Sequence, residues 1–170
     1  MSQISTYKMP FKRRLSQKTN YKKRLALLQS GLPRAVVRKS NKSIIVQIIE
    51  YDKKGDKTIV SGVSTQLTDF GWKFFTKNIT AGYLTGYMVG LKAKKLGIKK
   101  VVLDIGLSTP VHKSRLFASM KGLVDAGIEV PHDAEVFPSE DRIKGVHLKQ
   151  NAKSLFDTVK SEIEKKFGEK

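Results

Sequence analysis

The sequence predicts an α/β protein in which helices pack on a mixed β-sheet and a basic N-terminal extension precedes the folded part. Three observations support this class. Strand-like runs separated by short turns follow one another between residues 34 and 63, which predicts a three-strand antiparallel meander. Helical and strand-like runs then alternate up to residue 130, which indicates βαβ-type crossovers. Finally, twelve Lys and Arg residues precede the first acidic residue, Glu50.

The composition allows one hydrophobic core and excludes several kinds of site. The chain has 170 residues, of which 39% are hydrophobic, and its mean hydropathy is -0.32. A chain of this length forms one domain of ordinary size. It has no cysteine, so disulfides, thiolate metal sites and cysteine nucleophiles are excluded. His112, His132 and His147 are too far apart in the sequence to form a short ligand pair, so we expect no metal and no cofactor.

Neither a membrane span nor a secretory signal is expected. The longest uncharged run, residues 78–91, has 14 residues, whereas a membrane-spanning helix needs about 20. The first twenty residues carry five cations with no apolar stretch between them, which is unlike a signal peptide. We therefore expect a soluble, intracellular protein.

Residues 1–33 are expected to form a basic arm followed by a helix. Residues 1–15 show no periodicity and predict an extended arm. Ser16 or Thr19 is the candidate N-cap of a helix that runs to about residue 30, with apolar residues at i, i+4 and i+7 on one face. Gly31 then ends the helix.

Residues 34–148 are expected to form the main domain, which begins with the antiparallel meander. Its strands are predicted at residues 34–38, 43–49 and 58–63. The first turn, Lys39-Ser40-Asn41-Lys42, gives the hairpin a basic tip, and Asn41 is expected to adopt a left-handed backbone there. The second turn is predicted at residues 52–55.

Two helices and two further strands complete the predicted domain. Thr80 is the expected N-cap of a helix over residues 81–96, which Gly97 ends. The glycines at positions 82, 86 and 90 lie on one face of this helix and predict close packing against the sheet. A strand at 99–105, a helix at 112–126 and a short fifth strand at 128–130 are expected to follow.

Residues 149–170 are expected to form a C-terminal docking helix. Apolar residues recur there at helical spacing in a segment of balanced charge. The stripe consists of Ala152, Leu155, Phe156, Val159, Ile163 and Phe167. This pattern predicts a helix that packs against the main domain, not a second basic arm.

The distribution of charge indicates a nucleic-acid partner. The chain has 33 Lys and Arg residues against 15 Asp and Glu, a formal net charge of +18, and twelve of the cations lie within residues 1–42. Like charges repel, so such crowding favours an external polyanion. Tyr7, Phe11 and Tyr21 alternate with these cations and supply faces on which bases can stack. The alternatives are a merely solubilising basic tail and a membrane-surface helix, which the short apolar stripe without tryptophan disfavours.

The carboxylates are too sparse to favour a metal-dependent nuclease. Two-metal phosphoryl chemistry needs several acids that converge from strand ends, whereas the first predicted strand has none and the second ends near Glu50 and Asp52. Asp104 is the one carboxylate within a strand that the sequence predicts to be buried. It is a candidate for a lone metal ligand or for a cap of the following loop, and the capping role is favoured. No Walker-type phosphate loop and no nucleophile–base pair is present. We expect no catalytic residues and no enzyme activity.

Several motifs carry a resemblance to one family. They are YKMPFKRR at residues 7–14, TNYKKRLALLQSG at 19–31, VRKSNK at 37–42, GW at 71–72, AGYLTG at 81–86, LDIGL at 103–107, VPH at 130–132 and RIKGVH at 142–147. Together they span nearly the whole chain. The sequence resembles the large-subunit ribosomal proteins that bind 5S ribosomal RNA, in their archaeal and eukaryotic form.

The resemblance implies a non-catalytic scaffold of the cytoplasmic ribosome. Such a protein would attach 5S rRNA to the large rRNA in the central protuberance, beside neighbouring large-subunit ribosomal proteins that include the other 5S-binding protein. No membrane partner is implied. The family fold is a mixed α/β sheet preceded by a basic extension, which agrees with the pattern of strands and helices above.

The resemblance and the charge pattern together give a set of candidate RNA-binding residues. From the arm and first helix these are Lys8, Lys12, Arg13, Arg14, Tyr21, Lys22, Arg24 and Arg34; from the hairpin tip, Arg38, Lys39, Ser40, Asn41 and Lys42; and from the loop after Asp104, Ser108, Thr109, His112 and Lys113. The rival interpretations are a nuclease that depends on Asp104 and a basic chaperone or DNA-compacting protein that binds duplex DNA and structured RNA equally.

Overall fold

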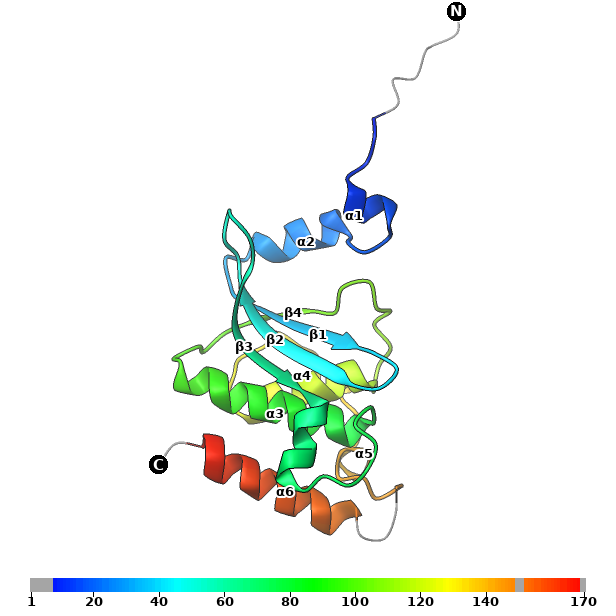
Figure 1. Cartoon of the computed structure of the whole chain (residues 1–170), viewed down its shortest axis with the longest axis vertical. Helices are drawn as coiled ribbons and strands as arrows, with labels where there is room; N and C mark the ends of the chain where they lie inside the picture. The colour runs from blue at the N-terminus through cyan, green and yellow to red at the C-terminus, as the bar shows by residue number, and fades with distance from the viewer. Residues whose placement is uncertain (1–7, 149–151, 169–170) are drawn as a thin grey trace, which may run out of the picture.

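A four-stranded mixed sheet forms the centre of the protein (Figure 1). The computed structural model describes residues 8–148 and 152–168. The strands are β1 (Arg34–Lys39), β2 (Ile44–Glu50), β3 (Lys57–Val63) and β4 (Val102–Asp104), in the order β3-β2-β1-β4. β1, β2 and β3 pair antiparallel, and β4 pairs parallel with β1. The predicted meander, its parallel crossover and the fold class are thereby confirmed.

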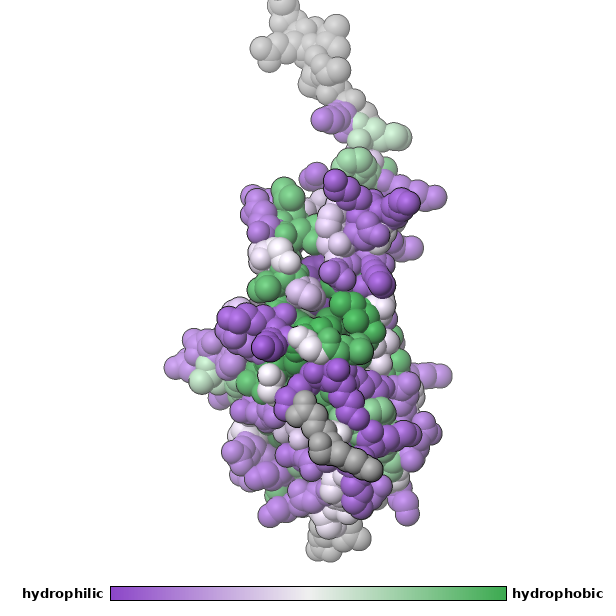
Figure 2. Space-filling view, turned by 90° about the vertical axis from the view of Figure 1, so that its left-hand side faces the viewer, coloured by the Kyte–Doolittle hydropathy of each residue, from purple (hydrophilic) through white to green (hydrophobic). Residues whose placement is uncertain are grey.

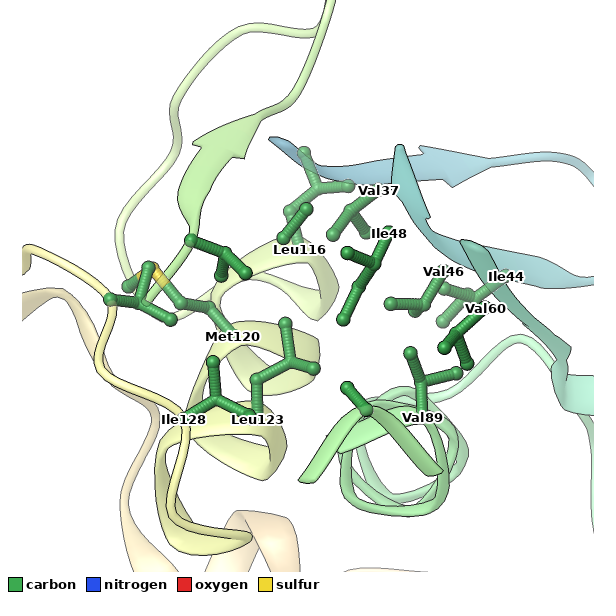
Figure 3. Close-up of a cluster of buried hydrophobic side chains, with 14 of the residues drawn as sticks. Val37, Ile44, Val46, Ile48, Val60, Val89, Leu116, Met120, Leu123 and Ile128 are labelled. Atoms are coloured by element: carbon green, nitrogen blue, oxygen red, sulfur yellow. The ribbon is translucent and has the colours of Figure 1, made fainter. Parts of the chain in front are cut away.

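One face of the sheet is buried and the other is partly open. Ile44, Val46 and Ile48 on β2 are fully buried, while the residues between them are only half-buried. This alternation is the period-two pattern of a strand with one face on a core. Side chains from the sheet meet those of two helices there, with Val89 on one helix and Leu123 on the other (Figure 3).

The two helices that cover the buried face are α3 (Ile79–Lys95) and α4 (Arg115–Asp125). They approach each other closely because glycines line their contact. A Cβ added at Gly86 would lie 2.0 Å from the carbonyl oxygen of Ser119, and one at Gly122 would lie 2.2 Å from that of Tyr83. The glycine row was expected to pack against the sheet, and that expectation is wrong, because the sheet is not its main packing partner. The row lies against α4, because its glycines leave room for the backbone of that helix to come close.

A third layer lies on the side of α3 away from the sheet (Figure 1). The C-terminal helix α6 (Ala152–Phe167) buries Phe156, Val159 and Ile163 against α3 and the 3-10 helix η1 (Ser64–Phe70). The predicted helix and its apolar stripe are confirmed. Trp72, which follows η1, is 2% exposed in the same cluster. The short elements η2 (Ala134–Val136) and α5 (Glu140–Ile143) connect α4 to this layer.

The N-terminal segment has more helix than expected. The arm was predicted to be extended to residue 15, but α1 (Lys12–Leu15) lies within it, and α2 (Tyr21–Leu28) follows. Neither expected N-cap caps α2. Asn20 does so, accepting the N–H of Lys23 at 3.1 Å, while the hydroxyl of Thr19 accepts a hydrogen bond from Arg13.

Four further expectations need correction. Asn78, not Thr80, caps α3, accepting the N–H of Ala81 at 2.7 Å. Helix α4 starts three residues later than predicted, and β4 has three residues, not seven. The fifth strand is absent from the described part of the chain, where Lys100 and Glu129 form only an isolated bridge.

The turn between β1 and β2 also differs from its prediction. Asn41 does not have a positive φ; within the described ranges, the non-glycine residues that do are Gln17 and Lys113. Ser40 organises the turn instead. Its hydroxyl oxygen accepts the N–H groups of Lys42 and Ser43, and its own N–H donates to the carbonyl of Ser43 at 2.8 Å. Since the serine side chain holds the backbone, no left-handed residue is required.

Within residues 8–148 and 152–168, no helix is both long and apolar enough to cross a bilayer.

The glycine contact between α3 and α4 predicts that alanine lowers the stability of the protein more at Gly86 than at Gly82. Gly86→Ala should lower the free energy of unfolding by about 1–3 kcal/mol, the usual range for an overpacked core. Gly82→Ala is the matched control, because its Cβ would meet its nearest atoms at 3.1 Å and alanine offers better helix propensity. Urea unfolding of both variants measures the difference, and equal stability of the two would contradict the close contact at Gly86.

Candidate nucleic-acid interface

A chain of alternating arginine and aspartate side chains joins the basic N-terminal segment to the sheet. Helix α2 lies on the side of the sheet opposite α3 and α4 (Figure 1). The participants are, in order of contact, Arg24, Asp56, Arg34, Asp104 and Arg38, and we call them the arginine–aspartate chain. Since three cations alternate with two anions, every anion in it touches two cations.

Asp56 is the link to α2. It lies in the turn before β3, and its two carboxylate oxygens each accept one guanidinium at 2.7 Å, from Arg24 of α2 and Arg34 of β1. Arg24 keeps about 30% of its side chain exposed, while that of Arg34 is 3% exposed. The carboxylate therefore holds a surface helix against a buried arginine.

Asp104 is the link within the sheet. Its register partner on β1 is Val36. Arg34, Val36 and Arg38 lie on the same face of β1 because side chains two residues apart share a face of the sheet, so Asp104 lies between the two arginines. One oxygen of Asp104 accepts Arg34 at 2.8 Å and the other accepts Arg38 at 3.0 Å. The guanidinium of Arg38 also donates to the backbone carbonyl of Asp104 at 2.6 Å.

Asp104 also caps the loop that follows it, as the sequence predicts. The N–H of Gly106 donates to its carboxylate at 2.8 Å. Gly106 has a positive φ of 62°, and an added Cβ there would lie 2.9 Å from the guanidinium carbon of Arg38. The position thus favours glycine both for its backbone and for the close approach of the arginine.

The electrostatics of the arginine–aspartate chain keep both carboxylates ionised. For Asp56, the hydrogen bond from Arg24 lowers the pKa below its ordinary value in spite of partial desolvation. For Asp104, burial by itself would raise the pKa, but the charge of Arg38, the N–H of Gly106 and the charge of Arg34 outweigh it, so the pKa is lowered. The hydrogen bond that Arg24 donates to Asp56 in turn raises the pKa of Arg24.

A groove runs between the N-terminal helices and the outer face of the sheet. Its volume is about 570 Å³, and it is lined by six cations and two acids together with apolar side chains. The charged lining residues are Arg13, Lys18, Lys23, Arg24, Arg34, Arg38, Asp56 and Asp104. Figure 2 shows apolar side chains gathered between the N-terminal part and the body, with hydrophilic side chains around them. Such a mixture of cations and apolar surface suits a polyanion with flat apolar faces.

A second hollow of about 590 Å³ lies against the same two helices and is lined by Arg14, Gln17, Thr19, Asn20, Tyr21, Lys22 and Leu107. The ring of Tyr21 lies 5.2 Å from that of Phe11, centroid to centroid, at an interplanar angle of 57°. Phe11 is 72% exposed. An exposed ring held by a neighbouring ring is a suitable surface on which a base can stack.

The predicted site residues fall into three groups by exposure. Exposed positions are held by Lys8, Lys12, Arg13, Arg14, Lys22, Lys39, Ser40, Asn41, Lys42, Thr109, His112 and Lys113, and half-buried ones by Tyr21, Arg24, Arg38 and Ser108. Arg34 alone is buried. The sequence predicts that it contacts RNA, and in the structure both of its terminal nitrogens are engaged by carboxylates inside the protein.

The structure also places residues in the groove that the sequence interpretation did not assign to it. Lys18 and Lys23 line the groove beside Arg13. Asp56 is the most important omission, because it joins two arginines that are 10 residues apart in the sequence. The only sequence signal for it is indirect: Arg34 begins a strand whose next three residues are buried and apolar, and a cation there needs a partner.

The carboxylates of the described residues do not form the cluster that a two-metal nuclease would require. In the part of the chain that the structure describes, no group of three or more His, Asp and Glu side chains is placed to hold a metal ion. Asp104, the candidate metal ligand, is instead bound by two arginines.

The arginine–aspartate chain predicts a pH-dependent loss of stability. Asp104→Asn should lower the free energy of unfolding at pH 7 by about 1–3 kcal/mol, because it removes one of the two carboxylates that pair with the buried Arg34. The pKa of Asp104 is lower in the folded protein than in the unfolded one, so its contribution is present above about pH 4 and is lost as the pH falls through the folded value. Urea titrations at pH 7 and at successively lower pH below 4 should therefore show the stabilities of the variant and the parent converging as the pH falls.

Glu129→Gln is the matched control for this experiment. Glu129 is 67% exposed, and its ion-pair partner among the described residues is the exposed Lys100, so its replacement should change stability by less than about 0.5 kcal/mol. If Asp104→Asn were as stable as Glu129→Gln at pH 7, the buried pairing would contribute nothing.

Comparison with known proteins identifies the family. The family model described as "Ribosomal large subunit proteins 60S L5, and 50S L18" matches residues 5–101 and 92–133. The large ribosomal subunit protein uL18 of Korarchaeum cryptofilum (strain OPF8) is 47% identical over 155 residues, which cover 91% of this chain and 80% of that protein. With a family model that spans more than half of the chain and a relative this similar, the chain belongs to the family of ribosomal large subunit proteins 60S L5 and 50S L18 and is a structural constituent of the large ribosomal subunit.

Proposed function

We propose that this ribosomal protein, located with the ribosome in the cytoplasm, binds 5S rRNA and attaches it to the large rRNA in the central protuberance. The other 5S-binding protein and further large-subunit proteins are its proposed neighbours there. The observation that supports the proposal most strongly is the cation-lined groove beside α2. Helix α2, which supplies Lys23 and Arg24 to this groove, is held on the sheet by Asp56.

The proposed contacts divide by kind. Exposed lysines and arginines of the arm and the β1–β2 turn meet phosphates, which supplies affinity without sequence preference. The rings of Phe11 and Tyr21 stack on bases. Arg38 has 42% of its side chain exposed beyond its bonds to Asp104, so one edge of a fixed guanidinium remains available to a phosphate.

This function predicts a steep dependence of RNA binding on salt. Arg34 is buried, so eleven of the twelve N-terminal cations remain for phosphates. If about 6–8 of them are engaged, log K should fall against log salt with a slope between about -4 and -7. Titration of 5S rRNA, a length-matched RNA and duplex DNA measures both slope and preference. A slope shallower than about -2, or equal affinity for all three, would contradict the proposal.

The position of Asp56 predicts that its replacement weakens RNA binding, although electrostatic repulsion alone predicts the opposite. Removing an acid from a surface that binds a polyanion should strengthen binding. Asp56→Asn should instead weaken binding of 5S rRNA by about tenfold, because α2 loses its attachment and must be ordered when RNA binds.

Asp52→Asn is the matched control for that variant. Asp52 lies in the same turn, where its carboxylate accepts only the N–H of Lys54 among the described residues, and asparagine can accept the same bond. It should bind RNA as tightly as the parent or slightly more tightly. Equal affinities of the two variants in a filter-binding assay would show that Asp56 does not position the arm.

A further inference from the structure

Three loops meet at one end of the sheet and form a surface that neither the groove nor the arm includes. The first is the β1–β2 turn, residues 39–43; the second joins η1 to α3, residues 71–78; and the third is the part of the β4–α4 connection that lies outside the groove, residues 108–114. All three lie at the right-hand end of the sheet in Figure 1. We call this region, together with Arg115 at the start of α4, the end surface.

Hydrogen bonds join these segments to one another. The hydroxyl of Thr76 donates to the backbone carbonyl of Lys42 at 2.8 Å. The guanidinium of Arg115 donates to the carbonyl of Lys77 at 2.7 Å. These two bonds connect the middle segment to the turn on one side and to α4 on the other, so the end surface has a defined shape.

Phe75 protrudes from the middle of this surface. It is 78% exposed, the largest exposed fraction of any large hydrophobic side chain in the described ranges. Its backbone is nevertheless held in place, because its carbonyl accepts the indole N–H of Trp72, whose side chain is buried in the core. The neighbouring Phe74 packs its ring on that indole at 5.5 Å. Phe75 is thus an exposed ring on an ordered loop.

The charge around this ring has a single sign. The end surface contains Lys39, Lys42, Lys73, Lys77, Lys113 and Arg115, and none of its segments contains an Asp or Glu. An exposed phenyl ring among cations has the composition of a surface for unpaired nucleotides, whose bases stack and whose phosphates are neutralised. An apolar protein partner would leave these six cations without a counter-charge.

We propose that the end surface is a further RNA contact, at which Phe75 stacks on an unpaired base and Lys73 and Lys77 neutralise the adjacent phosphates. The inference rests on the proposed RNA-binding function, but it concerns a surface to which the groove beside α2 does not extend. The contact takes unpaired nucleotides and not duplex, because only an unpaired base exposes a face to the ring.

Substitution of Phe75 separates stacking from simple apolar contact. The full chain is titrated with a labelled single-stranded RNA of ten nucleotides and with a blunt-ended RNA duplex of the same length. Phe75→Leu should weaken binding of the single strand by about 5- to 100-fold, the range expected for the loss of one base–aromatic stack. Phe75→Trp should retain the parent affinity, and the affinity for duplex should change in neither variant. Since the side chain is exposed, all variants should have the same melting temperature as the parent.

The ring of Phe11 could also bind a single strand and conceal the effect, so both substitutions of Phe75 are repeated in a Phe11→Leu background. Lys73→Gln should make the salt slope shallower by about 0.7, the value for one phosphate contact on a single strand. If Phe75→Leu binds the single strand within twofold of the parent in both backgrounds, or if leucine and tryptophan behave alike, the proposal is overturned. That failure would leave the preference for 5S rRNA and its salt slope intact, whereas loss of these would overturn the proposed function itself.

Discussion

The ion pairs of Asp56 with Arg24 and Arg34 are the interaction on which the functional surface depends. Eight cations lie within the first 24 residues, and their mutual repulsion opposes any compact arrangement. Two carboxylates placed between three arginines reverse that effect at the junction, because each anion contacts two cations. The remaining cations can then be presented together, with their counter-charge supplied from outside the protein.

The rest of the fold keeps this junction in place. Arg34 and Arg38 are at fixed positions because β1 lies between β2 and β4 in the sheet, and the sheet is held by the core that it shares with α3 and α4. That core is compact because Gly86 and Gly122 let the two helices touch. A packing feature on one side of the sheet thereby supports an electrostatic feature on the other.

Short-range patterns predicted most of the fold but not the junction. The alternation along β2, the turns and the C-terminal stripe are local, and they identified β1, β2, β3 and α6 correctly. The partner of the glycine row and the status of residues 128–130 depend on which elements meet in space, which one sequence does not state. Asp56 was missed for the same reason, since its partners lie 22 and 32 residues away in the sequence. The burial of Arg34, one of the twelve N-terminal cations, was not predicted either, since neighbours in the sequence cannot show it.

The most direct test of this account measures whether the arm is held in place before RNA binds. The chain has no cysteine, so Lys22→Cys and Lys53→Cys introduce two unique sites for spin labels, one on α2 and one in the turn that carries Asp56. Pulsed electron paramagnetic resonance on the RNA-free protein should give one narrow distance distribution, and Asp56→Asn should broaden it. A distribution that is equally broad with and without the Asp56 carboxylate would contradict the account, because α2 would then be positioned by RNA alone.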